Sequence, residues 1–249
     1  MLSLIPEYAE HGLKALDLNF CEMMNPGSEL NGDGWGYIEK LEELKKEHGL
    51  SYIQAHAPYP RNYAALTNDD KKLSDNEILR SMEYAERLGI PHIVIHPIKG
   101  SVEENASYFS SLLERSGTSI MIAIENMEDD GISQPDDLME ICERIGGRAG
   151  ICLDTGHANM RSLDIPTFIR TCGEKLIATH IADNDGKSDQ HLLPGFGNIC
   201  WEDVIPAFRE SYGGYLTLEC MFFSRRLPRV LSGSIIDLAL AVNFWLADL

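Results

Sequence analysis

Short apolar runs alternate with longer amphipathic segments along the whole chain. Continuous apolar runs are typical of parallel strands buried on both faces, whereas an apolar stripe that repeats every three to four residues indicates a helix packed on one side. The apolar runs predict strands at residues 13–19, 51–55, 92–96, 120–125, 149–154, 176–181 and 215–219. The amphipathic segments predict helices at residues 3–11, 36–48, 75–88, 103–115, 135–145, 166–172, 201–210 and 232–247. This alternation predicts an α/β fold with a parallel sheet.

Residues that begin and end helices stand at the expected boundaries. Asp75 precedes the apolar part of one predicted helix, and Pro135 opens another, as helix N-termini prefer. Gly49, Gly89 and Gly117 stand where helices should end, because glycine readily adopts the left-handed conformation there. No linker, low-complexity tract or change of composition interrupts the pattern, so we predict a single domain that spans residues 1–249.

The order of the elements fits a TIM-type (β/α)8 barrel, a fold of roughly 250 residues. Seven strands are predicted, and the helix predicted at residues 3–11 already precedes the first of them. We therefore expect a barrel whose first strand is missing or atypical. Two sheet edges would then lack a partner, and either a loop or a second copy of the chain would have to cover them. A homo-oligomer is one solution to this problem.

Composition and charge narrow the class of protein. Hydrophobic residues make up 44% and charged residues 24% of the chain, as in an ordinary globular protein. The net charge of −18 disfavours nucleic acid as a general partner, because an acidic surface repels phosphates. Six scattered cysteines without a C-x-x-C pair indicate reduced thiols and a cytoplasmic location. The most apolar stretch, residues 235–246, is shorter than the roughly 20 residues of a membrane span, so no membrane association is expected.

Six of the seven predicted strands end in a histidine or an acidic residue. These residues are His56, His96, Glu125, Asp154, His180 and Glu219. In α/β barrels the carboxyl ends of the strands converge on one mouth, where active sites lie. Three carboxylates and three imidazoles buried together are costly unless something compensates for them. A divalent cation is the simplest compensation, and such mixed ligands suit Zn²⁺, Mn²⁺, Co²⁺ or Fe²⁺ better than Ca²⁺. A metal-free network of His–carboxylate hydrogen bonds is the alternative.

A polar loop follows the sixth predicted strand, at residues 183–199. Its Asn-Asp-Gly sequence is typical of a solvated turn. Asp189 and His191 are two residues apart, however, so in an extended segment both side chains point the same way and can reach over the mouth. The Pro-Gly-x-Gly sequence at residues 194–197 then gives a tight backbone that a substrate could approach closely. We therefore interpret the loop as functional.

Two segments, LDTGHAN at residues 153–159 and HIADNDGKSDQHLLPGFGNICW at residues 180–201, carry a resemblance to a known family. The chain resembles the xylose isomerase-like TIM barrel superfamily, which joins sugar and sugar-phosphate isomerases and epimerases to apurinic endonucleases of the endonuclease IV type. In the isomerase and epimerase branch, the resemblance implies a single-metal site with the two glutamates as acid–base catalysts and His157 in contact with the substrate. The ligands of that site would be Glu125, Asp154, His180 and Glu219.

The endonuclease branch has more ligands, and the resemblance implies a three-metal cluster for it. Every ligand type has a counterpart here: His56, His96, Glu125, Asp154, His157, His180, Asp189, His191 and Glu219. The ligand inventory therefore does not separate the branches, although the Asp-Asn-Asp-Gly-Lys and Pro-Gly-x-Gly-x-Ile-x-Trp sequences resemble the sugar branch. In the sugar branch, the residues outside the metal site would bind the substrate: His56, His96, His157, Asp189 and His191.

The leading hypothesis is a divalent-metal-dependent isomerase or epimerase that acts on a small sugar or sugar phosphate. The metal (Mn²⁺, Zn²⁺, Co²⁺ or Mg²⁺) would stabilise the enediolate formed when a proton leaves the carbon next to a carbonyl. Glu125 and Glu219 would remove and return that proton. Arg225, Arg226 and Arg229 could meet a sugar phosphate. The alternatives are an apurinic endonuclease, in which metals activate water for phosphodiester hydrolysis, and a metal- or sugar-binding barrel without turnover.

Overall fold

The structure is a computed structural model that describes residues 2–60, 63–129, 131–220 and 228–249, with only the backbone described at residues 64 and 229. The chain forms two compact units. Unit 1 comprises Met1–Ile124 and Ile141–Ala149, and unit 2 comprises Glu125–Glu140 and Gly150–Leu249. Six strands follow one another in chain order, from β1 to β6. Among the described residues, no helix has both the length and the apolar character that a membrane span requires.

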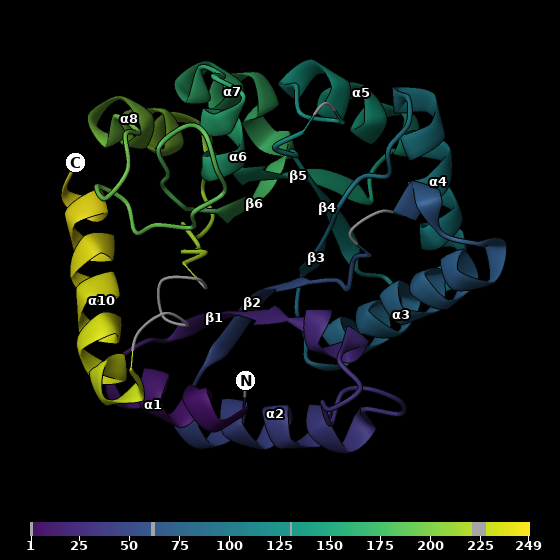
Figure 1. Cartoon of the computed structure of the whole chain (residues 1–249), viewed down its shortest axis with the longest axis horizontal. Coiled ribbons are helices and arrows are strands. Elements are labelled where there is room, and N and C mark those ends of the chain that lie inside the picture. Colours follow the sequence, from purple (N-terminus) through teal and green to yellow (C-terminus); the bar gives the residue numbers. More distant parts are fainter. Residues whose placement is uncertain (1, 61–62, 130, 221–227) are drawn as a thin grey trace. The chain divides into compact units, whose positions relative to one another are not determined.

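Unit 1 consists of parallel strands connected by helices. Its strands are β1 (Ala15–Asn19), β2 (Ser51–His56), β3 (His92–Ile95) and β4 (Met121–Glu125), the last residue of which belongs to unit 2. Its helices are α1 (Ile5–Glu10), α2 (Trp35–His48), α3 (Asn68–Arg87) and α4 (Val102–Ser116), with short 3₁₀ helices at Leu2–Leu4, Phe20–Met24 and Tyr63–Ala65. Helices α2 and α3 lie on the same side of β1 and β2 (Figure 1). All the strand pairs within unit 1 are parallel, as the continuous apolar runs predict.

Local hydrogen bonds fix where the helices of unit 1 begin. Ser101 accepts a hydrogen bond from the backbone of Glu104, and the Glu104 carboxylate accepts one from the backbone of Ser101, which forms a capping box before α4. Thr67 caps α3 in a similar way by accepting a hydrogen bond from the Asp70 backbone. Each cap stabilises its helix by about 1 kcal/mol. The cap at Thr67 explains why α3 begins at Asn68 and not at residue 75, as the apolar pattern predicted.

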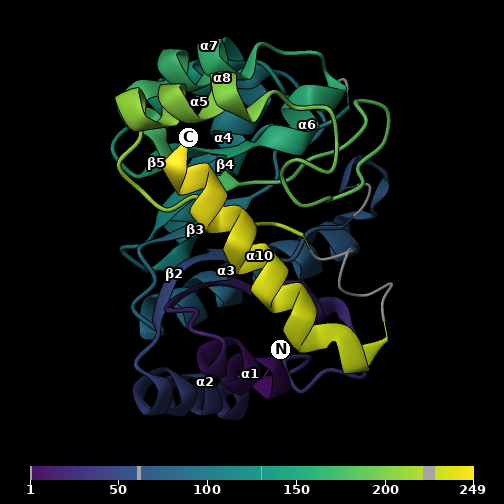
Figure 2. The same cartoon turned by 90° about the vertical axis from the view of Figure 1, so that its left-hand side faces the viewer.

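Unit 2 carries β5 (Ala149–Asp154, from Gly150 onward) and β6 (Leu176–His180), which pair in parallel. Its helices are α6 (Thr155–Met160), α7 (Ile165–Cys172), α8 (Trp201–Ser211) and α10 (Ser232–Asp248), with 3₁₀ helices at Gly173–Lys175 and Arg229–Leu231. Helix α5 (Pro135–Ile145) begins in unit 2 and ends in unit 1. Helices α7 and α8 lie side by side in both views, and α10 is the long yellow helix of Figure 2.

Buried apolar side chains from strands and helices form the core of each unit. In unit 1, Val94 of β3, Leu41 of α2 and Met82 of α3 are all fully buried. In unit 2, Leu153 of β5 and Phe168 of α7 are buried in the same way. Removing each such side chain from water contributes about 1.5–3 kcal/mol, so these strands and helices are stable only when packed together.

Most of the predicted elements are present, with two differences. The strand predicted at residues 215–219 forms only an isolated parallel bridge between Leu218 and Ile181. Helix α6 was not predicted, because its six residues show no apolar period. Within the described residues, helix α1 precedes the first strand, as expected for a fold whose first strand is missing or atypical. The single domain spanning residues 1–249 stays a prediction.

Candidate metal centre

Strand register brings four potential metal ligands together in unit 2. The parallel pairing of β5 and β6 places Asp154 opposite His180. The bridge between Ile181 and Leu218 places Glu219 next to the end of β6, because the Glu219 backbone donates to the Ile181 carbonyl at 3.0 Å. Glu125 is the last residue of β4. One ligand atom from each of these four residues lies within 4.8 Å of the others.

His180 lies between the two glutamates of this group. Its Nδ1 atom is 3.0 Å from Glu125 Oε1 and 3.5 Å from Glu219 Oε2. The side chains of His180 and Glu125 are 1% and 2% exposed, and that of Glu219 is 17% exposed. Two carboxylates, one from the end of β4 and one from the segment just after the Leu218 bridge, therefore meet one imidazole away from bulk water, where their electrostatic interactions are strong.

His157 is held beside this group by the first turn of α6. Asp154 caps the helix, because its Oδ1 accepts a hydrogen bond from the His157 backbone at 2.7 Å. Asp154 itself exchanges two hydrogen bonds with Asn126, and His157 Nδ1 donates to the Asn126 carbonyl at 2.9 Å. His157 Nε2 is then left to face Glu128 Oε2 at 3.5 Å and Asp189 Oδ2 at 4.0 Å.

The loop after β6 brings Asp189 and His191 next to each other. His191 Nε2 lies 2.7 Å from Asp189 Oδ2, and His191 Nδ1 donates to the Glu219 carbonyl at 3.1 Å. His191 has a left-handed backbone with φ of 46°, which is unusual for a residue with a side chain. The loop therefore adds the His191–Asp189 pair, which contacts the Glu125–Asp154–His180–Glu219 group through the Glu219 carbonyl.

The concentration of carboxylates changes the protonation of this region. Burial, opposed by His180 and reinforced by Asp154 and Glu125, raises the pKa of Glu219 to about 7. Burial alone would lower the pKa of His157, but nearby carboxylates, with Asp154 first among them, outweigh it and raise that pKa to about 9. His191 behaves in the same way, since burial is outweighed by the hydrogen bond to Asp189, and its pKa also rises to about 9. The region is short of positive charge, which a cation would supply.

The four residues fit a divalent cation. Asp154 Oδ2 is buried and accepts no hydrogen bond from any residue that the structure describes, whereas Oδ1 of the same side chain is engaged by the helix cap. A buried carboxylate oxygen without such a donor is costly unless a cation or water satisfies it. Three carboxylates and one imidazole form a donor set that Mn²⁺, Zn²⁺, Co²⁺ and Mg²⁺ accept to different degrees.

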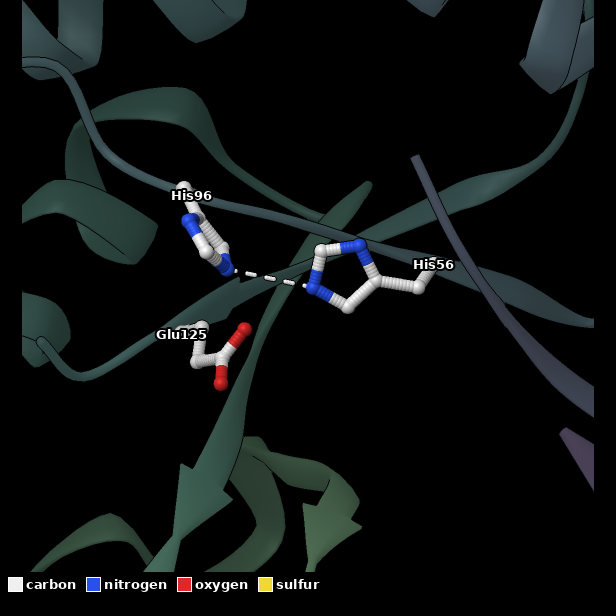
Figure 3. Close-up of side chains that lie close together, drawn as sticks. All are labelled: His56, His96 and Glu125. Atoms are coloured by element: carbon white, nitrogen blue, oxygen red, sulfur yellow. Dashed lines mark hydrogen bonds between the residues drawn. The ribbon is translucent and has the colours of Figure 1, made fainter. Parts of the chain in front are cut away.

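His56 and His96 lie in unit 1, where they form a close pair. His56 ends β2, and its Nε2 atom is 3.1 Å from His96 Nε2, as Figure 3 shows. His56 Nδ1 donates to the Ala57 carbonyl at 2.8 Å, and the Tyr59 ring stacks on His96 at 4.0 Å between centroids. Figure 3 also labels Glu125, which belongs to unit 2. The structure thus brings Asp189, His191, His157 and the four-residue group together within unit 2, and His56 with His96 within unit 1.

Sequence reasoning missed several residues that shape the site. Asn126 and Glu128 follow Glu125 closely in the chain, and their position just after a predicted strand end is the signal that could have identified them. Asp183 belongs in sequence to a polar loop, but it is fully buried. The close approach of a substrate to the backbone at residues 194–197 stays a prediction, and at Gly197 Asp183 and Asn184 occupy the space where a side chain would begin. Arg225 and Arg226 lie outside the described residues, as does the side chain at residue 229.

Comparisons with known proteins place the fold and the family. A probable endonuclease 4 of Geobacillus sp. is 29% identical over 195 residues, which cover 65% of this chain and 65% of that protein. A solved D-tagatose 3-epimerase-like protein is 26% identical with a TM-score of 0.72, over 98% of this chain and 94% of the other. The IolI protein with a bound zinc atom has a TM-score of 0.75 at 17% identity, over 98% and 91% of the two chains.

These likenesses confirm the predicted TIM-barrel-like α/β fold. The family model described as xylose isomerase-like TIM barrel matches residues 5–228, which is most of the chain. The chain therefore belongs to the xylose isomerase-like TIM barrel family.

Proposed function

We propose that this protein is a divalent-metal-dependent isomerase or epimerase of a sugar or sugar phosphate. The observation that carries the proposal is that Glu125, at the end of β4, and Glu219, just after the bridge at Leu218, both reach His180. Both glutamates belong to the four-residue group that can hold one cation. A pair of carboxylates on either side of a substrate is what proton abstraction and return at a carbon atom requires.

The residues divide the chemistry between them. A divalent cation held by Glu125, Asp154, His180 and Glu219 would polarise a carbonyl group and stabilise negative charge on its oxygen. One glutamate removes the proton from the carbon next to the carbonyl, and the C–H electron pair becomes the C=C bond of an enediolate. Return of a proton to the opposite face of the same carbon gives the epimer. Return to the former carbonyl carbon, with transfer of the hydroxyl proton from the neighbouring oxygen to the former carbonyl oxygen, gives the isomer. The rate of this proton transfer then depends on the pKa of Glu219 relative to the pH.

The imidazoles beside the glutamates would orient the substrate. His157 Nε2 and His191 Nε2 both face the Asp189 carboxylate, at 4.0 and 2.7 Å, and these three polar groups would exchange hydrogen bonds with the hydroxyl groups of a polyol. His56 and His96, in unit 1, stay predicted substrate-binding residues. The likeness to a D-tagatose 3-epimerase-like protein supports a sugar substrate, and the likeness to IolI with zinc supports a bound cation.

Deuterium exchange tests the proposal directly. The Mn²⁺-loaded protein is incubated in deuterium oxide with a panel of ketoses, inososes and sugar phosphates. We expect deuterium at the carbon next to the carbonyl of at least one substrate, and Glu219→Gln should lose the exchange while remaining folded. Glu202→Gln, which changes an exposed glutamate at the start of α8, is the matched control and should keep the exchange. If no compound exchanges above the rate without protein, this function is wrong.

A second candidate is hydrolysis of a phosphodiester at an abasic site. It is favoured by the additional His–carboxylate groups, since Asp189 Oδ2 lies 2.7 Å from His191 Nε2 and 4.0 Å from His157 Nε2. These groups could hold more than one cation, as the resemblance to the endonuclease branch implies. The test is nicking of an abasic duplex, which should disappear in Asp189→Ala. Calorimetric sugar binding without either reaction would instead identify a binding protein without turnover.

A further inference from the structure

Asp183 lies three residues after the end of β6 and is fully buried. Among the described residues, none of the hydrogen-bond donors to its carboxylate is a cationic side chain. Its Oδ1 accepts hydrogen bonds from the backbones of Asn184 at 2.9 Å and Ile199 at 3.2 Å. Its Oδ2 accepts from the backbone of Gly195 at 2.9 Å and from the Trp201 indole at 3.0 Å. A single carboxylate therefore holds the beginning, the later part and the end of the loop at residues 184–200.

The backbone of Asp183 holds the middle of the same loop. Its N–H donates to the Leu192 carbonyl at 2.8 Å and its carbonyl accepts from the Leu192 N–H at 2.9 Å, which forms an antiparallel bridge. Leu192 directly follows His191, so this bridge fixes the position from which the His191 side chain extends. His191 then reaches the Glu219 carbonyl on one side and the Asp189 carboxylate on the other.

The loop is packed so closely around Asp183 that one position must be glycine. A Cβ atom at Gly197 would overlap Asp183 Oδ1 and the backbone of Asn184. Asn184 in turn ties the loop to α6, because its Nδ2 donates to the Gly156 carbonyl at 2.8 Å. Gly156 precedes His157, so the loop and the helix that carries His157 are connected through one buried amide.

We propose that Asp183 is a positioning residue that sets the loop at residues 184–200 and thereby holds Asp189 and His191 against Glu219. Among the described residues, the Asp183 carboxylate makes no hydrogen bond or ion pair with the four-residue ligand group, and its role is to order the loop. Asparagine in its place would turn an N–H donor toward backbone or indole N–H groups, so part of the loop would lose its acceptor. The role in turnover rests on the proposed function, but the positioning of His191 does not.

The experiment compares Asp183→Asn with Asp75→Asn. Asp75 is the control in unit 1, because its carboxylate, which is 13% exposed, also accepts several hydrogen bonds, from Tyr63 at 2.8 Å and Arg115 at 2.9 Å among others. The first readout is the imidazole nitrogen and proton resonances of His191 in protein labelled with ¹⁵N-histidine, assigned with His191→Gln. The second is kcat/KM for the substrate found by deuterium exchange. The third is stability in urea, which both variants should lower.

The expected result separates positioning from general destabilisation. Asp183→Asn should shift or broaden the His191 resonances and lower kcat/KM by at least about tenfold, because small displacements of reacting groups are costly. Asp75→Asn should leave both unchanged while it loses stability. If the wild-type protein has no turnover, the proposed function fails, but the His191 resonances still decide whether Asp183 positions the loop.

Unchanged His191 resonances in folded Asp183→Asn protein would overturn the inference, as would an equal shift in Asp75→Asn. If Asp183→Asn does not fold, Trp201→Phe replaces it, because it removes the indole donor to Asp183 Oδ2 and leaves the charge of Asp183 in place. A shift of the His191 resonances in Trp201→Phe supports the inference, and resonances identical to those of the wild-type protein contradict it.

Discussion

The two carboxylate oxygens of Asp154 have different partners, and one of them ties this residue to His157. Oδ1 accepts the backbone N–H of His157 at 2.7 Å and so begins α6. Oδ2 is buried and accepts no hydrogen bond from the residues that the structure describes. One side chain therefore sets the helix that carries a candidate substrate-binding imidazole and also offers an oxygen to a cation.

This division predicts the effect of Asp154→Asn. The amide oxygen can keep the helix cap, but the second position carries an NH₂ group, which repels a cation. Mn²⁺ affinity, measured by calorimetric titration, should fall at least about 100-fold with the fold retained. Asp164→Asn is the control, because Asp164 caps α7 with a 2.7 Å bond to the Thr167 backbone, away from the ligand group. Equal losses in both variants would show that capping, not ligation, explains the effect.

Removal of divalent cations should destabilise the protein. A cation that binds only the folded state at 100 times its dissociation constant adds about 2.7 kcal/mol to the free energy of unfolding. For a chain of this size we expect the melting temperature to rise by roughly 5–10 °C when Mn²⁺ is added to chelated protein. Thermal unfolding with and without Mn²⁺ checks this, and Asp154→Asn should abolish most of the rise. Identical melting curves would count against a resident cation.

Stability should also fall in acid because of His92, at the start of β3. Burial, only partly opposed by Asp17, lowers the pKa of His92 to about 4 from its ordinary value of 6.5. Below pH 6.5 His92 is protonated in the unfolded chain, whereas in the folded chain it stays neutral down to about pH 4. The free energy of unfolding is therefore highest above pH 6.5 and decreases as the pH falls from 6.5 to 4.

His92→Gln removes this proton linkage. In urea titrations, the wild-type protein should lose about 1–2 kcal/mol more than the variant between pH 7.5 and pH 5. The comparison at two pH values cancels any constant effect of the substitution on packing. If both proteins lose the same free energy over this interval, His92 is not held neutral in the folded state.

Leu153→Asp should prevent folding. Leu153 is fully buried in the middle of unit 2, and an ionised carboxylate in its place would be desolvated without a partner. We expect a loss of more than about 4 kcal/mol, seen as a collapsed urea transition or insoluble protein. Leu153→Met, which nearly conserves volume, should cost less than about 1.5 kcal/mol. Soluble and folded Leu153→Asp protein would contradict the burial of this side chain.

The sequence predicted β5 correctly and α6 not at all, for physical reasons. Residues 149–154 form a continuous buried run, and such a run can be recognised as a strand from the sequence without knowing which strands pair with it. Helix α6 has four buried residues among its six and begins with Thr155-Gly156-His157, so it has no polar face to reveal a period. Its existence depends on the cap from Asp154, which is a tertiary arrangement at the end of a strand.

In the candidate site, too, some residues could be predicted from the sequence and others could not. The identities of Glu125, Asp154 and His180 were predictable because polar residues at strand ends converge in this kind of fold. The roles of Asn126 and Asp183 were not, because both act by accepting backbone N–H groups from distant segments. A polar residue that satisfies backbone donors looks the same in sequence as one that faces water, and only the path of the loop distinguishes the two.

The left-handed backbone at His191 has a consequence for how this protein responds to selection. A residue with a side chain pays roughly 1–2 kcal/mol for this conformation, and glycine does not. Libraries screened for heat tolerance alone would weigh this cost against the two contacts of the buried imidazole, to Asp189 and to the Glu219 carbonyl, both of which glycine would lose. Such a screen does not test the proposed function, so it would exert no selection for the imidazole beyond these two contacts.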